Sequence, residues 1–456
     1  MHFCGDGISV DENGRYFRIA NAFAGESVDA EDVSIRRRKQ AWLNEVIDPS
    51  PHRCSPICPN WKSCPACQFA CLDTAAQERL KNDSWMKLIR RFVTIPETCS
   101  VEFESAIEVL GYRHRTDAVL FRPDGRPMFG ILPRLDAAVV QIRQFCSQHG
   151  LEIPDFTALE ADEILALPGI EPVSLHCCAL HCPELGRLIE KTASQADLTG
   201  FETGTKFGFE ANGESARITV FAMPERAEKT RASAEKLSES LGVTVIFQCL
   251  PPRGSHVYPK PEAFGSPWYC YGYDENNAPL DALKGAWTPV NPVNAGLIRK
   301  TLDRYLGQNH YHQALEIGCG CGTHSALFAA HADAYTGIDA AWPAILSAQH
   351  NAEINGWQNA VFYTDTAEHY LDKRYYSGRR AEAILMHSNR MPYSKKTAEL
   401  CRRFGAVAMY IVAPTAFALA QECAHFADLG YRLEKLTLCN TLPMTYHQMG
   451  VALMRL

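Results

Sequence analysis

Hydrophobic and polar positions follow three different patterns along this chain. In the first 50 residues they alternate in short runs, which turn residues such as Asp11–Gly14 and Gly25 separate. This alternation predicts a small β-barrel. Apolar residues recur at the wider spacing that is typical of helices at 72–93, 180–195 and 225–241, within an otherwise mixed stretch. From about residue 293 a helix leads into alternating strands and helices, which predicts a doubly wound parallel sheet.

These patterns divide the chain into three predicted domains. They are an OB-like β-barrel at 1–50, a mixed α+β central domain at 51–285 and a Rossmann-like α/β domain at 286–456. The longest uncharged run extends from Gly405 to Ala420 and contains Pro414, so it predicts a buried strand and a turn, not a membrane helix. The first residues, MHFCGDGISV, lack the basic start and apolar run of a signal peptide. We therefore expect a cytoplasmic protein that does not enter a membrane.

The segment ALEIGCGCGT is the most informative part of the last domain. Gly318, Gly320 and Gly322 form a turn between a buried strand and a helix, where the backbone must pass close to a ligand. Asp339 ends the second strand and can accept from both hydroxyls of an adenosine ribose, while Asp365 ends the third and can accept from the adenine amino group. Glu316 is expected to face the amino-acid end of the ligand. The pattern favours S-adenosylmethionine over a dinucleotide or an empty pocket.

A longer run, GIDAAWPAILSAQHNAEINGWQNAVFYTD, resembles the corresponding run of the RNA uracil-5-methyltransferase family. Two further segments are similar to that family. AFAGESV, at 22–28, is similar to its OB-like TRAM barrel, and LGYRHRTD, at 110–117, to its central domain. The resemblance implies a class I methyltransferase fold that binds S-adenosylmethionine and structured RNA, either ribosomal or transfer RNA. We expect the protein to be a monomer.

The composition contains 18 cysteines, which is a high count for a chain without a secretory signal. Cys58, Cys64 and Cys67 have the spacing C-x5-C-x2-C, and three such thiolates can hold an iron–sulfur cluster or a zinc ion with a fourth ligand. The spacing is similar to that of the cluster-bearing ribosomal branch of the family. That resemblance implies a [4Fe–4S] cluster with Cys146 as fourth ligand, while Cys71 and Cys54 are rival ligands and zinc is the alternative metal.

The net charge of −7 argues against a generally basic coat, so RNA contacts are expected on local basic faces. The candidates are Arg113, Arg115 and the run from Arg36 to Lys39. Such arginines and lysines suit contacts with the phosphate backbone. The alternative is that each of these side chains is an exposed cation that binds no RNA.

The family's chemistry uses a cysteine that adds to C6 of uracil and a glutamate that removes the C5 proton. In this chain YIVAPT places Ala413 at the cysteine position, and HQMGVALM places Met449 at the glutamate position. HSNR places His387 at a family aspartate, and WTPVN places Pro289 at a glutamine that touches the cofactor. Possible substitutes for the lost groups are the thiols of Cys401, Cys423 and Cys439 and the imidazoles of His387 and His447.

These substitutions predict that the covalent route to 5-methyluracil is absent. The first hypothesis is therefore a non-catalytic or accessory RNA-binding homologue, a pseudoenzyme that still binds S-adenosylmethionine. The alternative is an active RNA methyltransferase with altered chemistry or target, which the retained glycines and acids favour. A redox or iron-sensing protein is a third class, supported only by the thiols.

Overall fold

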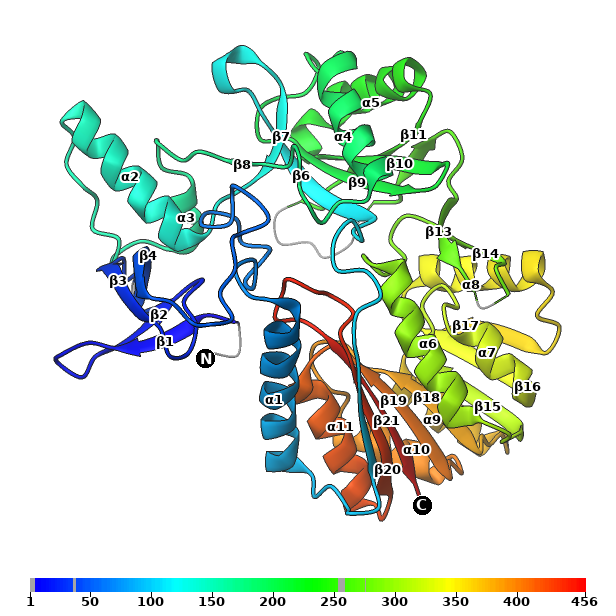
Figure 1. Ribbon diagram of the computed structural model, residues 1–456. Coiled ribbons are helices and arrows are strands. Elements are labelled where there is room, and N and C mark those ends of the chain that lie inside the picture. Colours follow the sequence, from blue (N-terminus) through cyan, green and yellow to red (C-terminus); the bar gives the residue numbers. More distant parts are fainter. Residues whose placement is uncertain (1–4, 36–37, 253–258, 275) are drawn as a thin grey trace.

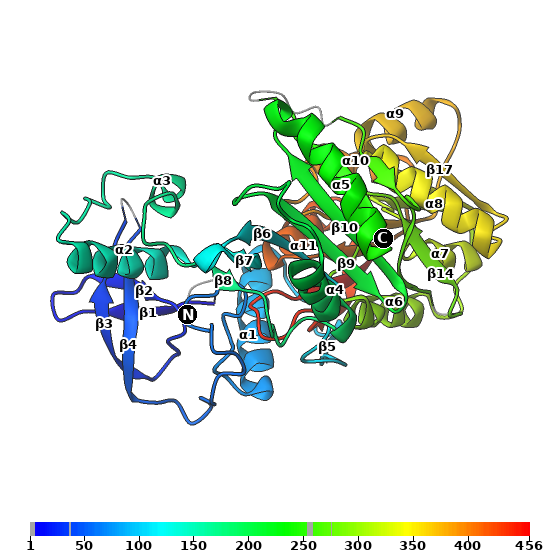
Figure 2. The ribbon, with the colours of Figure 1, turned by 90° about the horizontal axis from the view of Figure 1, so that it is seen from above.

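The computed structural model describes residues 5–35, 38–252, 259–274 and 276–456. Within these residues the strands form a four-stranded front sheet, a seven-stranded central sheet, an eight-stranded C-terminal sheet and a two-stranded hairpin. Figures 1 and 2 show the front sheet standing to one side of the body that the other two sheets form.

The front sheet consists of β1 (Gly7–Val10), β2 (Tyr16–Ile19), β4 (Gln40–Asp48) and β3 (Ser27–Asp32), in that order. The predicted turn between the first two strands is confirmed, because Asp11 Oδ1 accepts from the backbone N–H groups of Asn13 and Arg15 at 3.0 and 2.8 Å. Helices α2 (Leu135–His149) and α3 (Ala161–Leu165) cover this module and pack on Val33 and Ile35 (Figure 1). The prediction of a strand-rich front module is therefore confirmed.

The central sheet has the order β12-β11-β10-β9-β6-β7-β8. Its strands are β6 (Arg115–Phe121), β7 (Met128–Ile131), β8 (Val173–Ser174), β9 (Lys206–Asn212), β10 (Ser215–Ala222), β11 (Thr244–Cys249) and β12 (Glu262–Phe264). Helices α4 (Pro183–Gln195) and α5 (Ala227–Leu241) confirm the two predicted helices and bury one face of the sheet. Because successive side chains of a strand point to opposite faces, Phe207 and Phe209 enter this core while Gly208 and Glu210 face the other way.

The hairpin of β13 (Tyr269–Tyr273) and β14 (Pro279–Ala282) leads into the C-terminal domain. Tyr271 on this hairpin is buried, and its hydroxyl lies 2.8 Å from Thr323 Oγ1 in the glycine-rich turn. The hairpin therefore anchors the last domain to the chain that precedes it.

The C-terminal sheet has the order β17-β16-β15-β18-β19-β21-β20-β5. The parallel strands are β15 (Tyr311–Ile317), β16 (Ala332–Asp339), β17 (Ala360–Thr364), β18 (Ala383–His387) and β19 (Ala408–Ala413); β21 (Met449–Arg455) is antiparallel between β19 and β20 (Arg432–Cys439). The helices are α6 (Pro292–Leu306), α7 (Ser325–Ala330), α8 (Trp342–Asn355), α9 (Ala367–Tyr376), α10 (Lys395–Arg403) and α11 (Ala416–Asp428). The predicted doubly wound sheet is confirmed, and the strand order reverses at β15, where such folds bind ligands.

A segment from the first third of the chain also belongs to this sheet. Helix α1 (Thr74–Phe92) packs on α11 through Trp85, Met86 and Ile89, and β5 (Ser100–Glu104) pairs with β20 as the edge strand (Figure 1). The division into 1–50, 51–285 and 286–456 stays a prediction. Within it, residues 74–104 lie against the last domain and α2 and α3 lie against the first.

Candidate functional site

The glycine-rich turn follows β15 at the point where the strand order reverses. Gly318, Gly320 and Gly322 have φ angles of 74°, 55° and 84°, in the left-handed region that glycine tolerates best. A Cβ atom on Gly318 would lie 3.1 Å from the carbonyl oxygen of His387, and one on Gly322 would lie 3.0 Å from the Trp357 ring. The sequence therefore needs glycine at both positions, because His387 and Trp357 lie against the turn. The predicted close approach of this backbone to a ligand stays a prediction.

The two predicted acids stand at neighbouring strand ends. Asp339 Oδ2 accepts from the N–H of Gly320 at 3.0 Å, and its Oδ1 accepts from the N–H of Ala341 at 2.8 Å. Asp365 follows β17, and its N–H donates to the carbonyl of Asp339 at 3.0 Å. Each carboxylate oxygen has two lone pairs, so Asp339 can still accept from a ligand after these bonds. The placement of both acids at one sheet edge is confirmed, and their contacts with a ligand stay a prediction.

Glu316 takes a different position from the one we expected. Its side chain is fully buried, and both oxygens accept hydrogen bonds from the protein. Oε2 accepts from Ser325 Oγ at 2.9 Å and from the Tyr335 hydroxyl, and Oε1 lies 2.8 Å from His387 Nε2. The expectation that Glu316 faces a ligand is therefore wrong, because burial beneath the turn directs its carboxylate to these three side chains.

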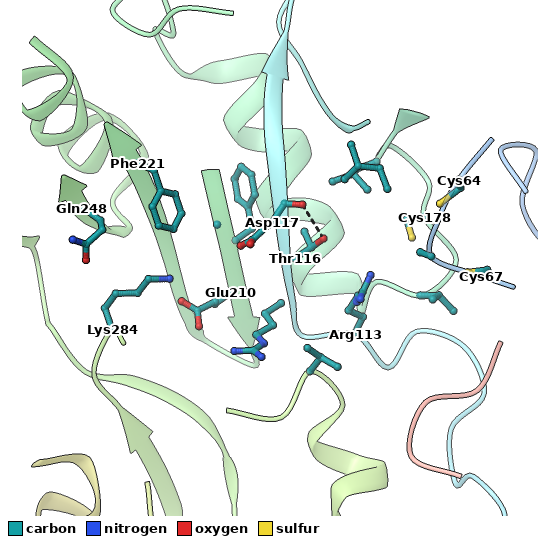
Figure 3. Close-up of a pocket in the computed structure, with 18 of the residues that line it drawn as sticks. Cys64, Cys67, Arg113, Thr116, Asp117, Cys178, Glu210, Phe221, Gln248 and Lys284 are labelled. Carbon is teal, nitrogen blue, oxygen red and sulfur yellow. Dashed lines mark hydrogen bonds between the residues drawn. The ribbon is translucent and has the colours of Figure 1, made fainter. Parts of the chain in front are cut away.

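A cavity of about 910 Å³ opens where the central sheet, the cysteine segment and the C-terminal domain meet. Its floor is the face of the central sheet opposite α4 and α5, and Figure 3 shows Glu210, Phe221, Gln248 and Lys284 lying around it. Five cations contribute to the wall, against the acids Asp117 and Glu210; they are Arg113, Arg115, Lys260, Lys284 and Arg390. Trp342 adds an aromatic ring that is 46% exposed. Cations beside aromatic rings suit a ligand that combines phosphates with bases.

The predicted RNA-binding cations are partly in this cavity. Arg113 and Arg115 line it, as predicted candidates for backbone contacts. Of the basic run near the front, Arg36 and Arg37 lie outside the described residues, while Arg38 and Lys39 are exposed on the front module. The sequence did not point to Lys260, Lys284 and Arg390 as RNA-binding cations. Lys284 lies 5.3 Å from the centre of the Phe221 ring, and burial lowers its pKa.

Cysteines meet at one end of the same cavity. Cys58, Cys64 and Cys67 line it together with Cys178, and Figure 3 shows the sulfur atoms of Cys64, Cys67 and Cys178 near one another. Burial raises the pKa of Cys67 to about 12, with further contributions from Cys64 and Cys178. No three Cys, His, Asp or Glu side chains among the described residues are already arranged to hold a metal ion.

Cys146 is not part of this group. It lies on the buried face of α2 in the core that contains Val33, Ile35 and Ile142, so the expectation that it is the fourth ligand is wrong. The residue that joins the three cysteines is Cys178, within the tract His176–Cys182, HCCALHC. This Cys/His-rich tract was the available sequence signal. Cys54 and Cys71, the rival ligands, lie next to each other instead, with the Cys54 N–H donating to the Cys71 carbonyl at 2.9 Å.

Comparisons with known proteins place this geometry in context. No family model matches the chain. The 23S rRNA (uracil(1939)-C(5))-methyltransferase RlmD of Shewanella halifaxensis is 22% identical over 459 residues, covering 99% of this chain and 93% of that protein. RlmD of Hahella chejuensis is 24% identical over 464 residues, with coverages of 98% and 94%. The chain is homologous to the RNA uracil-C5-methyltransferases.

A solved structure shows the same fold. The tRNA (uracil-54, C5)-methyltransferase of Pyrococcus abyssi, in complex with S-adenosyl-L-homocysteine, superposes with a TM-score of 0.67 at 14% identity. The match covers 98% of this chain and 100% of that one. The predicted fold class is thus confirmed across nearly the whole chain.

Ala413 and Met449, which stand at the positions of the family's cysteine and glutamate, lie close together at the end of neighbouring strands of the sheet. Ala413 is the last residue of β19 and pairs with Gly450, which follows Met449 on β21. Ala413 is completely buried, and Met449 is half-buried opposite Cys439. Neither side chain can attack C6 of a pyrimidine or accept a proton.

The three thiols named as possible substitutes for the nucleophile are buried. Cys401, Cys423 and Cys439 are at most 1% exposed, and burial raises the pKa of Cys439 to about 12 and those of the other two well above their usual range. A buried, protonated thiol is a poor nucleophile. Burial also lowers the pKa of His447 to about 4, which leaves that imidazole neutral at pH 7.

Among the helices of the described ranges, none has the length and apolar character needed to cross a bilayer.

Proposed function

We propose that this chain binds S-adenosylmethionine and structured RNA, and that it does not methylate C5 of uracil through a cysteine adduct. The observation that carries the proposal is the glycine turn with Asp339 at the reversal point of the sheet. There the N–H of Gly320 and the Asp339 carboxylate are joined at 3.0 Å, next to the end of β15.

The residues at this edge fit the cofactor. Gly320 has no atom within 4 Å of the place where a Cβ would lie, which leaves room for a ligand against the backbone, and Asp339 and Asp365 offer acceptors for the ribose hydroxyls and the adenine amino group. Glu316 contributes indirectly, through the side chains that it holds. When bound, S-adenosylmethionine supplies an electrophilic methyl group.

The RNA would occupy the cavity of about 910 Å³. Its five cations can contact phosphates, and Trp342 offers a ring on which a base can stack. The relatives named above act on 23S rRNA, and the solved structure belongs to a tRNA enzyme, so ribosomal or transfer RNA is the proposed class. We further propose that the protein is a monomer and works in the cytoplasm. Sedimentation of the full chain tests whether it is a monomer.

The covalent route requires a thiolate and a carboxylate that Ala413 and Met449 do not provide. This supports a non-catalytic or accessory RNA-binding homologue as the first form of the proposal. One observation favours the second form, an active methyltransferase of different chemistry: His387 is held by the buried Glu316 at the edge where the cofactor would bind.

The four cavity cysteines, Cys58, Cys64, Cys67 and Cys178, would hold a [4Fe–4S] cluster, with zinc as the alternative. Thiols suit either metal, and the donor number is complete. Because no three of the described side chains are already in a ligating arrangement, the loop that carries Cys64 and Cys67 would close on the metal as it binds. A cluster would serve here to fix this cavity wall. Iron and zinc analysis of the purified chain, with its visible absorption, distinguishes the two metals.

The decisive experiment is calorimetry of the full chain with S-adenosylmethionine, using Asp339→Ala as a paired variant. We expect binding by the wild type and a clear loss of affinity in the variant. If the wild type does not bind, the proposal fails. If the wild type binds, nucleoside mass spectrometry of RNA from a strain lacking the gene separates the two forms of the proposal. If the protein is an accessory homologue, every methylated base is still present in that RNA. If it is an active methyltransferase, one methylated base is absent.

A further inference from the structure

A buried hydrogen-bond network fixes His387 at the carboxyl end of β18. The imidazole Nε2 lies 2.8 Å from Glu316 Oε1, on the neighbouring strand β15. Glu316 is itself held on its other oxygen by Ser325 and Tyr335, and the Tyr335 hydroxyl lies 2.7 Å from Ser325 Oγ. The carboxylate therefore has one fixed position beside the imidazole.

This network sets the tautomer of the imidazole. A carboxylate accepts hydrogen bonds, so the proton of a neutral His387 is on Nε2 and the lone pair is on Nδ1. His324 stacks on His387 with ring centres 5.0 Å apart and an angle of 10° between the planes. Burial holds the pKa of His324 well below its usual value, and the charges of His387 and Arg299 lower it further. The His324 ring is therefore neutral.

The location of His387 links the two parts of the site. Its carbonyl oxygen and Cβ would lie 3.1 and 3.4 Å from a Cβ on Gly318, so the residue rests on the glycine turn. The Tyr393 hydroxyl lies against the same glycine, 3.4 Å from that Cβ position. The His387 side chain is 19% exposed, and Arg390, three residues further on, lines the RNA cavity.

We propose that His387 is the general base of a methyl transfer to a nitrogen or oxygen atom of RNA that carries a proton. This inference rests on the proposed binding of S-adenosylmethionine and RNA, and on the active form of that proposal. Such an acceptor needs no thiolate, because loss of its proton alone frees the electron pair that attacks. The geometry thus points to a heteroatom, and not to C5 of uracil, as the methylated position.

The step balances as follows in atoms and charge. The acceptor's electron pair forms the new bond to the methyl carbon while the sulfur–carbon bond breaks, which leaves neutral S-adenosylhomocysteine. The acceptor's proton passes to Nδ1 of His387. The imidazolium is then stabilised by the Glu316 carboxylate, which makes Glu316 a positioning residue. The charged or titratable groups around the imidazole are Glu316, His324, Tyr335, Tyr393 and, beyond His324, Arg299.

The activity test uses S-adenosylmethionine labelled in its methyl group and total RNA from a strain lacking the gene. We expect His387→Asn to lower methyl incorporation about 100-fold or more, the usual contribution of a general base, without a change in cofactor affinity by calorimetry. The matched control is His310→Asn, an exposed histidine paired with Asp333 before β15. It should incorporate methyl groups like the wild type. Incorporation by His387→Asn at the wild-type rate overturns the inference.

A second readout does not depend on activity. Nitrogen-15 NMR of the histidines should show the Nε2–H tautomer for His387 in the wild type. Glu316→Gln can donate to Nε2 instead and should shift the ring toward the Nδ1–H tautomer, while Glu316→Asp should restore the wild-type tautomer and part of the rate. An Nδ1–H wild-type ring sinks the inference. If the wild type binds cofactor and RNA but transfers no methyl group, the inference fails and the binding function stands; if no cofactor binds, both fail.

Discussion

Arg217 and Glu210 form an ion pair of 2.8 Å beneath the main cavity, between directly opposed residues of β10 and β9. Their side chains are only 2% and 8% exposed, and Arg217 Nη1 also donates to the carbonyl of Ala282 at 3.0 Å. Burial alone would raise the pKa of Glu210, but the charges of Arg217 and Lys284 hold it below its usual value. The pair thus links the central sheet to the hairpin that leads into the last domain.

Removing Arg217 should be costly, because it leaves the Glu210 carboxylate buried without the guanidinium that pairs with it at 2.8 Å. We expect Arg217→Met to lower the free energy of unfolding by about 3–5 kcal/mol, as measured by urea denaturation. The double variant Arg217→Met with Glu210→Gln should cost less than the single variant. Equal losses in the two proteins would show that the unpaired carboxylate is not the cause.

Glu422 predicts a pH dependence of stability. Its Oε1 accepts from Ser388 Oγ at 2.9 Å and from the N–H of Tyr393 at 2.6 Å, while Oε2 is buried without a partner among the described residues. Burial raises its pKa from 4.5 to about 7. The folded state therefore holds this proton more tightly than the unfolded state, so its stabilisation is complete below pH 4.5 and is lost as the pH rises through about 7.

The loss should be on the order of 3 kcal/mol when the carboxyl group is fully ionised. Urea denaturation at pH 5 and pH 8 measures it in the wild type. Glu422→Gln cannot ionise, so its drop between the two pH values should be smaller by that amount. A variant with the same drop as the wild type would assign the pH dependence to other groups.

Gly318 predicts how cofactor binding responds to one added methyl group. Gly318→Ala places a Cβ 3.1 Å from the His387 carbonyl in a left-handed conformation, which costs about 1–2 kcal/mol in the backbone alone. The turn should shift, and calorimetry should show S-adenosylmethionine affinity about tenfold lower or worse. The control is Gly186→Ala on α4, where the Cβ meets no atom within 4 Å. Unchanged affinity in Gly318→Ala would separate this turn from the cofactor.

The cysteines give a paired prediction. Cys178→Ser should remove most of the bound metal and any brown absorption, because Cys178 lies with Cys58, Cys64 and Cys67 around one end of the cavity. Cys146→Ser should retain the metal, since Cys146 packs on the front module. Metal analysis of the two purified variants is the measurement, and the opposite result would restore Cys146 as the ligand.

Local sequence determined much of the C-terminal domain. The strand ALEIG, the three glycines and the acids Asp339 and Asp365 are close in sequence, and strand periodicity with glycine backbone preferences already indicates where each lies. The same holds for the turn at Asp11 and for the helices at 183–195 and 227–241. The absence of a thiol at Ala413 and of a carboxylate at Met449 was also readable directly from the residue types.

The tertiary structure decided which distant segments meet. The sequence indicated three clustered cysteines, but whether Cys146 or Cys178 joins them depends on α2 packing its apolar face on the front sheet. Likewise, Glu316 accepts from Ser325, Tyr335 and His387, which come from three different elements, and α1 and β5 join a sheet formed mostly by the last third of the chain. The spacing of apolar residues along the chain sets whether a segment forms a helix or a strand and which of its faces is buried. Contacts between remote elements form when their apolar faces are buried against each other, and no local pattern specifies which elements pair.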